Sequence, residues 1–145
     1  MTTYTAHEIL GGLYENTVKM TVSRRLRYMP YAQAGWIDIQ QKDGTTTSEL
    51  YSYSSLILTV SRRMIDGCQV VAGIHTYGAK AASNCSRTTS KQVTAALREL
   101  NLSYSEVYSI KHYLDRGGRF AFSFPRIDGD GSSQWCDVET GEVIA

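Results

Sequence analysis

One short segment near the N-terminus combines arginine and tyrosine more densely than any other part of the chain. Arg24, Arg25 and Arg27 lie beside Tyr28 and Tyr31. Guanidinium groups pair with phosphates and tyrosine rings stack on nucleobases, so this combination suits contact with a nucleic acid. An edge strand that carries charge to prevent edge-to-edge pairing has the same composition. The residues alone leave both interpretations open.

Tyrosine is unusually frequent, with ten copies against two tryptophans and three phenylalanines. Its ring supplies apolar area and its hydroxyl a polar tip, and it is enriched where surfaces bind partners. Tyr51 and Tyr53 are expected on one side of a strand, either stacking bases or forming the half-buried outer face of a sheet. Four basic side chains complete the candidate binding set: Arg62, Arg63, Arg87 and Lys91.

Catalysis has few candidate residues in this sequence. Cys85 with His75 or His112 could form a nucleophile and its base, but no local motif of a known nucleophile surrounds them. A buried cysteine and a surface histidine are the simpler interpretation. The sequence therefore favours a protein that is not an enzyme, and leaves this pair as the catalytic alternative.

Metal and cofactor motifs are also weak. The histidines and cysteines do not fall at zinc-ligand spacing. Asp128, Asp130 and Glu139 match positions one, three and twelve of a calcium loop, but the glycine falls at position four where position six is required. A plain turn explains them better. The chain has no glycine-rich phosphate motif, so we expect no metal and no cofactor.

Length and composition indicate an ordinary globular protein. The 145 residues fit one domain over 1–145, with 42% hydrophobic residues. No run approaches the about 18 apolar residues of a membrane helix, and the N-terminus lacks the features of a signal peptide. Cys68, Cys85 and Cys136 are widely spaced and odd in number, which favours free, buried thiols in a reducing compartment. We expect a cytoplasmic protein without membrane contact.

Charge is unevenly distributed although the net charge is only +1. Five acidic and no basic residues occur from Asp128 onward, so residues 1–127 hold fifteen bases against nine acids, a balance of +6. A basic body with an acidic end is suited to meet a polyanion. Solvated surface charge explains the same distribution.

The best-defined helix is expected between Thr89, as N-cap, and Asn101, as its stop. Gln92 lies three residues after Thr89, which is the spacing of a capping box. The apolar stripe has helical spacing and consists of Val93, Ala96, Leu97 and Leu100. Lys91, Arg98 and Arg87 are then expected to face solvent.

Two further helices are expected from capping boxes. Thr5 with Glu8 predicts a helix over about 6–19, weakened by two glycines. Ser103 with Glu106 predicts another that ends at Gly117-Gly118.

The remaining segments are expected to be strands. They cover 22–30, 35–41, 45–60, 68–77 and 119–125, with a hairpin over 134–144 and Asp-Gly turns at 43–44 and 66–67. Phe120, Phe122 and Phe124 alternate with small or polar residues, which is the clearest strand pattern. We expect Val93, Leu97 and Leu100 to pack on a sheet containing these phenylalanines. The fold class is α+β, a single domain with a largely antiparallel sheet packed by about three short helices.

Two segments together carry a resemblance. They read Tyr51-Ser-Tyr-Ser-Ser-Leu-Ile-Leu and Cys85-Ser-Arg-Thr-Thr-Ser-Lys-Gln. This pairing resembles small accessory proteins of bacteriophages and mobile elements, in which a Tyr-Ser-Tyr strand precedes a helix entered through Thr-Thr-Ser-Lys. In that group a histidine often follows the lysine, whereas Gln92 follows Lys91 here. The resemblance implies an accessory protein in the bacterial cytoplasm and no particular mechanism.

These observations lead to two main expectations about function. The first is a non-enzymatic protein that binds a host protein or nucleoprotein complex at a fixed ratio. It would inhibit a host nucleoprotein defence such as a CRISPR effector, with tyrosines and arginines as anchors. The alternative is direct binding of single- or double-stranded nucleic acid. A structural or assembly role stays open, as do the oligomeric state and the strand order.

Overall fold

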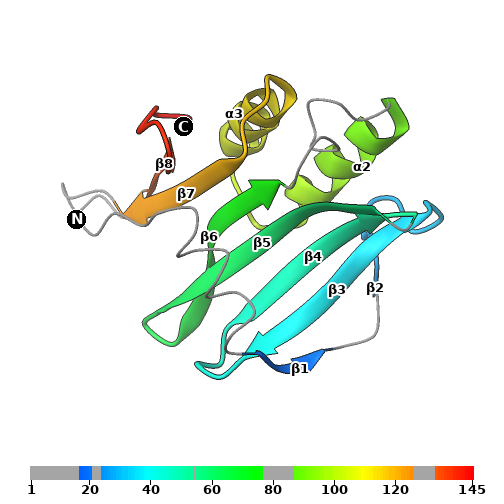
Figure 1. Ribbon diagram of the computed structural model, residues 1–145, viewed down its shortest axis with the longest axis horizontal. Coiled ribbons are helices and arrows are strands. Elements are labelled where there is room, and N and C mark those ends of the chain that lie inside the picture. Colours follow the sequence, from blue (N-terminus) through cyan, green and yellow to red (C-terminus); the bar gives the residue numbers. More distant parts are fainter. Residues whose placement is uncertain (1–16, 21–23, 54, 77–86, 126–132) are drawn as a thin grey trace.

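The computed structural model describes residues 17–20, 24–53, 55–76, 87–125 and 133–145. Eight strands form one antiparallel sheet, and two helices pack against one of its faces (Figure 1). The strands are β1 (Thr17–Met20), β2 (Arg24–Arg25), β3 (Ala34–Gln41), β4 (Thr46–Ser52), β5 (Ser55–Ile65), β6 (Cys68–Thr76), β7 (Phe120–Pro125) and β8 (Ser133–Asp137). The helices are α2 (Arg87–Arg98) and α3 (Tyr104–Asp115). The α+β class is therefore confirmed.

The strand order is β1-β3-β4-β5-β6-β7-β8, and β2 also pairs with β3. The expected N-terminal helix lies mostly outside the described residues. Its last part is wrong, because Thr17–Met20 pair with β3 as β1. The part of the chain that the structure describes thus holds two helices where about three were expected.

Two hairpin turns form where Asp-Gly pairs predict them. Gly44, between β3 and β4, has φ +89°, and Asp66 and Gly67, between β5 and β6, have φ +50° and +79°. Glycine adopts this left-handed region without steric cost. The Asp43 carboxylate accepts hydrogen bonds from the Thr45 hydroxyl and amide, which lowers the pKa of Asp43 below its usual value.

A third turn corrects the expectation of one strand over 45–60. Tyr53 adopts φ +57° and is 72% exposed, so the segment divides into β4 and β5. Its amide donates to the Gln33 carbonyl at 2.6 Å. Tyr51 lies within β4 and is half-buried. The two tyrosines therefore do not share one face of a strand.

The predicted apolar face of α2 is confirmed. Val93, Ala96 and Leu97 are fully buried, Leu100 is buried just after the helix, and Asn101 has φ +62° as a helix stop. The N-terminus of the helix differs, because it begins at Arg87 and Thr89 lies within the first turn. Gln92 is buried and bonds Ser52, so the predicted capping box is wrong.

The N-terminus of α3 is as predicted. The Ser103 hydroxyl accepts from the Glu106 amide, and the Glu106 carboxylate accepts from the Ser103 amide at 3.1 Å. Gly117, with φ +99°, follows the end of the helix. This reciprocal pair satisfies two amides that the helix cannot satisfy itself.

The core lies between the helices and one face of the sheet. The buried sheet residues of this core are Trp36, Leu50, Ile57, Leu58, Val60, Ile74, Ala121 and Trp135. On β7 it is Ala121 that joins the core, whereas Phe120 contacts His75, with 6.1 Å between ring centroids, and Phe122 contacts Phe124. β7 belongs to the same sheet as expected, but its residue in the core that includes Val93 and Leu97 is Ala121.

The C-terminal hairpin is also confirmed. Cys136 pairs with Val143 across a turn in which Gly141 has φ +78°. The backbone amide of Trp135 donates to the Ala145 carbonyl at 2.9 Å. Neither described helix is long or apolar enough to span a membrane.

Candidate functional site

The two helices leave a groove of about 500 Å³ on their outer side. We name it the tyrosine groove and define it by Tyr28, Arg98, Leu102, Tyr104, Val107 and Tyr108. Its residues come from α2, from α3, from the segment between them and from the loop after β2. The site is therefore assembled by tertiary packing.

Three tyrosines surround this groove. Tyr104 is 89% exposed, Tyr108 is 69% exposed and Tyr28 is 43% exposed. Tyr104 and Tyr108 are four residues apart on α3, so they lie on the same side of the helix. Val107 is buried between them and contributes to the apolar floor. Exposed aromatic rings over an apolar floor provide area that a partner can cover.

Two arginines hold the ring of Tyr28. The Arg98 guanidinium lies 4.9 Å from the ring centroid and the Arg27 guanidinium lies 5.5 Å from it. A cation over an aromatic face is attracted to the ring, so the orientation of Tyr28 is fixed before any partner arrives. Both arginines are exposed, so their N–H groups can still meet a partner.

The outer face of α2 carries a basic stripe next to the groove. Arg87, Lys91 and Arg98 are exposed and separated by four and seven residues, which places them on one helix face. On α3, Lys111 donates to Ser90 at 2.8 Å and pairs with Asp115 at 2.6 Å. The charge of Lys111 is thus balanced within the protein.

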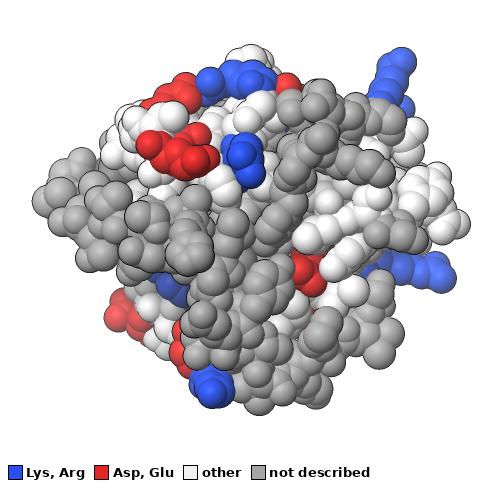
Figure 2. Space-filling model, viewed as in Figure 1, with Lys and Arg blue, Asp and Glu red and all other residues white. Residues whose placement is uncertain are grey.

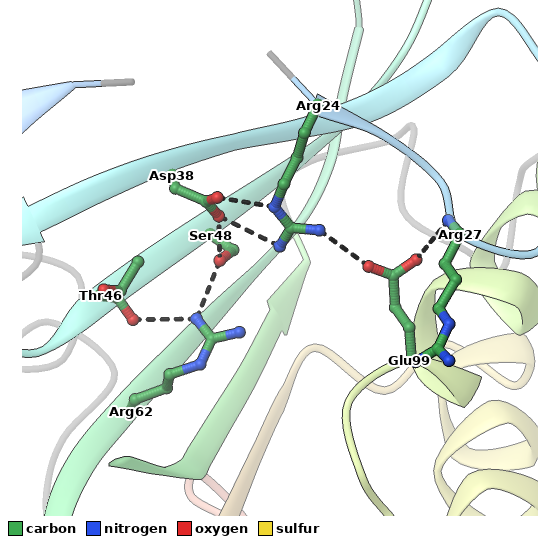
Figure 3. Close-up of polar contacts among 7 residues, drawn as sticks. All are labelled: Arg24, Arg27, Asp38, Thr46, Ser48, Arg62 and Glu99. Carbon is green, nitrogen blue, oxygen red and sulfur yellow. Dashed lines mark hydrogen bonds and ion pairs between the residues drawn. The ribbon is translucent and has the colours of Figure 1, made fainter. Parts of the chain in front are cut away.

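A second group of charged residues lies on the helix-facing side of the sheet (Figure 3). We name it the polar network and define it by Arg24, Asp38, Ser48, Arg62 and Glu99. Arg24 pairs with Asp38 at 2.6 Å and with Glu99 at 2.9 Å. Ser48 donates to Asp38 at 2.7 Å and accepts from Arg62 at 2.8 Å. Four neighbouring strands and the end of α2 are joined in this way.

Burial and charge pairing shift the pKa values of Asp38 and Arg62 in opposite directions. Burial disfavours ionisation of Asp38, but hydrogen bonds from Arg24 and Ser48 outweigh it and hold the pKa of Asp38 below its usual value. Burial lowers the pKa of Arg62, and attraction to Asp38 opposes that effect. Glu99 ties the end of α2 to the network, because its second oxygen accepts from the Arg27 amide at 2.9 Å.

The structure separates the predicted binding residues. Tyr28 lies in the tyrosine groove, Arg27 contacts its ring, and Arg87 and Lys91 lie on the basic stripe. Arg24 and Arg62 belong to the polar network, where Arg24 pairs with Glu99 and Arg62 donates to the Thr46 carbonyl. Neither residue lines the groove.

The other predicted binding residues lie outside the groove lining. Arg25 is exposed and its guanidinium lies 3.5 Å from the Pro30 carbonyl. Arg63 donates to the Ser123 carbonyl, and the Tyr51 hydroxyl donates to Glu49 at 3.3 Å. Tyr31 and Tyr53 are strongly exposed.

The candidate catalytic residues are not brought together among the described residues. His75 is fully buried beside Phe120, and burial lowers its pKa to about 4. His112 is exposed at the tyrosine groove, and Cys85 lies outside the described residues. Cys68 is exposed and Cys136 is half-buried, so the expectation of buried thiols is wrong for Cys68.

Metal ligands do not cluster in the described segments. No group of three His, Cys, Asp or Glu side chains within them is arranged to hold a metal ion. Asp128 and Asp130 of the notional calcium loop lie outside these segments.

Comparison of the chain with models of known families, with curated proteins and with solved structures finds no match. Function must therefore be argued from the geometry. Tyr104, Tyr108 and Arg98 are groove residues that sequence reasoning did not select for binding. The i, i+4 spacing of the two tyrosines on the polar side of a capped helix is a signal that could have selected them.

Proposed function

We propose that this protein acts without catalysis, by binding a partner at a fixed ratio through the tyrosine groove and the basic stripe. The partner is a host protein or nucleoprotein complex in the bacterial cytoplasm. This is the behaviour of a phage or mobile-element accessory protein that inhibits a host nucleoprotein defence, as an anti-CRISPR protein does. The observation that carries the proposal is the exposure of Tyr28, Tyr104 and Tyr108 around Arg98 on one groove.

The chemistry of the groove suits a protein partner with an acidic surface. Tyrosine and arginine are the residue types that dominate binding energy at interfaces, and they act best around a pocket. The contact between Arg98 and Tyr28 orients the ring in advance, which reduces the entropy lost on binding. Arg87 and Lys91 add positive charge at the rim, so acidic side chains on the partner are complementary.

Direct nucleic-acid binding is the second candidate, and the basic stripe is the observation that favours it. One of the predicted phosphate contacts, Arg24, is already paired with Asp38 and Glu99 in the polar network. On the face in Figure 2, the described basic side chains lie apart from one another, with acidic ones among them. Because Arg24 already has carboxylate partners, a protein partner is favoured over a phosphate backbone.

The proposal is tested by measuring which partner the tagged protein retains from a bacterial lysate, with and without nuclease treatment of the lysate. Tagged wild-type protein and a Tyr108→Ala variant are exposed to lysates of strains that carry CRISPR effectors, and the same strains are scored for phage plaques. We expect one effector to be retained after nuclease at a fixed molar ratio, to be lost with Tyr108→Ala, and to be inhibited only by the wild type.

Two outcomes would contradict this proposal. Retention that disappears with nuclease and falls steeply with salt would assign direct nucleic-acid binding instead. Equal retention and equal plaque counts for the wild type and Tyr108→Ala would show that the groove is not the binding face.

A further inference from the structure

A second hollow, of about 400 Å³, lies between the sheet and the segment that joins α2 to α3. We name it the Arg62 hollow and define it by Arg62, Val71, Leu100, Leu102, Ser123 and Trp135. Its lining combines apolar side chains from the helix connection, β6 and β8 with a larger polar part, which includes the carboxylates Glu99 and Glu106 and the Arg62 cation from β5. Small-molecule sites are concave and bring apolar side chains together with a few convergent polar groups, and both kinds of side chain are present here.

Arg62 is only partly used by the protein. Its Nη1 donates to the Thr46 carbonyl at 2.9 Å and to the Ser48 hydroxyl at 2.8 Å. Within the described part of the chain, its Nε and Nη2 make no hydrogen bond. Figure 3 shows its other terminal nitrogen pointing away from Thr46 and Ser48. The side chain is half-buried, so these N–H groups need an acceptor at the protein surface or in a ligand.

The two carboxylates at the hollow already have donors of their own. Glu99 accepts from Arg24 at 2.9 Å and from the Arg27 amide at 2.9 Å. Glu106 accepts from the Ser103 amide at 3.1 Å and from the Trp135 indole at 2.7 Å. Neither carboxylate forms a hydrogen bond with Arg62 in the described structure.

We propose that the Arg62 hollow binds a small organic carboxylate. The Nε and Nη2 groups of a guanidinium form a planar fork that matches both oxygens of a carboxylate. Val70, Val71 and Leu102, which are half-buried, would contact the hydrocarbon part of the ligand. Glu99 and Glu106 repel negative charge, so a singly charged carboxylate is favoured over a doubly charged phosphate. The hollow shares Leu102 with the tyrosine groove, but its cation is Arg62, so carboxylate binding does not depend on the partner surface proposed above.

The experiment uses the full chain labelled with nitrogen-15 and follows the Arg62 Nε–H and Trp135 indole N–H signals by NMR. The probes are butyrate and benzoate, their uncharged amides butyramide and benzamide, and inorganic phosphate. We expect saturable shifts of both signals with the carboxylates, none with the amides and weaker ones with phosphate. Equal shifts with carboxylates and amides, or no shifts with any probe, would overturn the proposal.

Two variants and a control locate the binding. Arg62→Lys keeps the charge but loses the fork, and we expect about tenfold weaker binding or more. Ser133→Tyr fills the hollow without altering the polar network, since Ser133 lines the hollow but makes no contact in that network, and it should also abolish the shifts. Arg98→Ala, in the tyrosine groove, should bind like the wild type. If Arg62→Lys does not fold, undiminished binding by Ser133→Tyr still refutes the assignment.

Discussion

The Ser52 hydroxyl, at the end of β4, donates a hydrogen bond of 2.6 Å to the amide oxygen of Gln92 in the middle of α2. Both side chains are buried, with 5% and 2% of their surface exposed. A polar pair inside an otherwise apolar helix interface has one favourable alignment, because any shift of the helix leaves a buried polar group without a partner. The bond therefore sets the position of α2 on the sheet.

Replacing either member of this pair should destabilise the fold. We expect Gln92→Ala and Ser52→Ala each to lower the free energy of unfolding by about 1–3 kcal/mol, because each leaves a buried polar group unpaired. The double variant should cost less than the sum of the two single changes. Urea denaturation of all four proteins measures the coupling, and strict additivity would show that the bond does not contribute.

Alanine substitutions on the buried face of α2 should destabilise the protein, whereas those on its outer face should not. Leu97→Ala should cost about 2–5 kcal/mol, from lost burial and a residual cavity. Lys91→Ala, on the exposed basic stripe, should change stability by less than about 0.5 kcal/mol. Thermal and denaturant unfolding compare the two, and similar losses from both would show that the helix face is misplaced.

Gly118 should not tolerate a side chain. A Cβ at this position would lie 2.3 Å from the ring of Tyr113. That ring is buried and its hydroxyl accepts from the Phe120 amide at 3.1 Å and donates to Asp137, so it has no room to move. We expect Gly118→Ala to cost about 1–3 kcal/mol in unfolding free energy, typical of overpacking. An unchanged melting temperature would contradict the observed packing.

His75 should make stability depend on pH in a defined window. Burial lowers its pKa from 6.5 to about 4, so the unfolded chain binds a proton more readily than the folded protein. Its contribution to stability is complete above pH 6.5, declines as the pH falls towards 4 and is lost below that, by about 3 kcal/mol in total. The comparison is the unfolding free energy of wild type and His75→Phe at several pH values.

His75→Phe should remove the decline in unfolding free energy between pH 6.5 and pH 4. The loss of stability at lower pH should remain. That later loss comes from carboxylates such as Asp38, whose pKa is held below the usual 3.8 by its hydrogen bonds from Arg24 and Ser48, even though burial opposes this. An identical decline between pH 6.5 and pH 4 in both proteins would exclude His75 as its cause.

Partner binding should depend on the tyrosine groove and not on exposed tyrosines elsewhere. We expect Tyr104→Ala, Tyr108→Ala and Arg98→Ala each to weaken binding of the captured partner by about 2 kcal/mol or more. Tyr53→Asn is the matched control, because asparagine tolerates the left-handed backbone at that turn. Titration calorimetry gives the affinities, and a large effect of the control alone would move the binding face to the turn.

Local signals predicted the two described helices and most of the described turns. The Ser103 and Glu106 capping box, the buried stripe of α2 and the Asp-Gly turns each depend on residues only a few positions apart in the sequence. The turn at Tyr53 had no such signal, since tyrosine rarely adopts positive φ. The alternation of Phe120 with Ala121 predicted a strand with two different faces, but it did not indicate which face the helices cover.

The site was less predictable because long-range packing assembles it. Tyr28 and Arg98 are far apart in sequence, and only the position of α2 on the sheet brings them together. The same packing places Arg24 beside Asp38 and Arg62 beside Ser48, which accept hydrogen bonds from them. From the sequence alone these arginines were expected at the surface, because only the fold shows that Asp38 and Ser48 lie beside them.

The strand order has a consequence for how the chain folds as it is synthesised. From β3 to β6 every strand pairs with the one that precedes it, so each hairpin can close as soon as it leaves the ribosome. Trp36, Leu50 and Ile74 then lie on a bare surface until α2 and α3 emerge, and β7 joins β6 only afterwards. During this interval the nascent sheet exposes an apolar face and an unpaired edge, which is the kind of surface that chaperones bind.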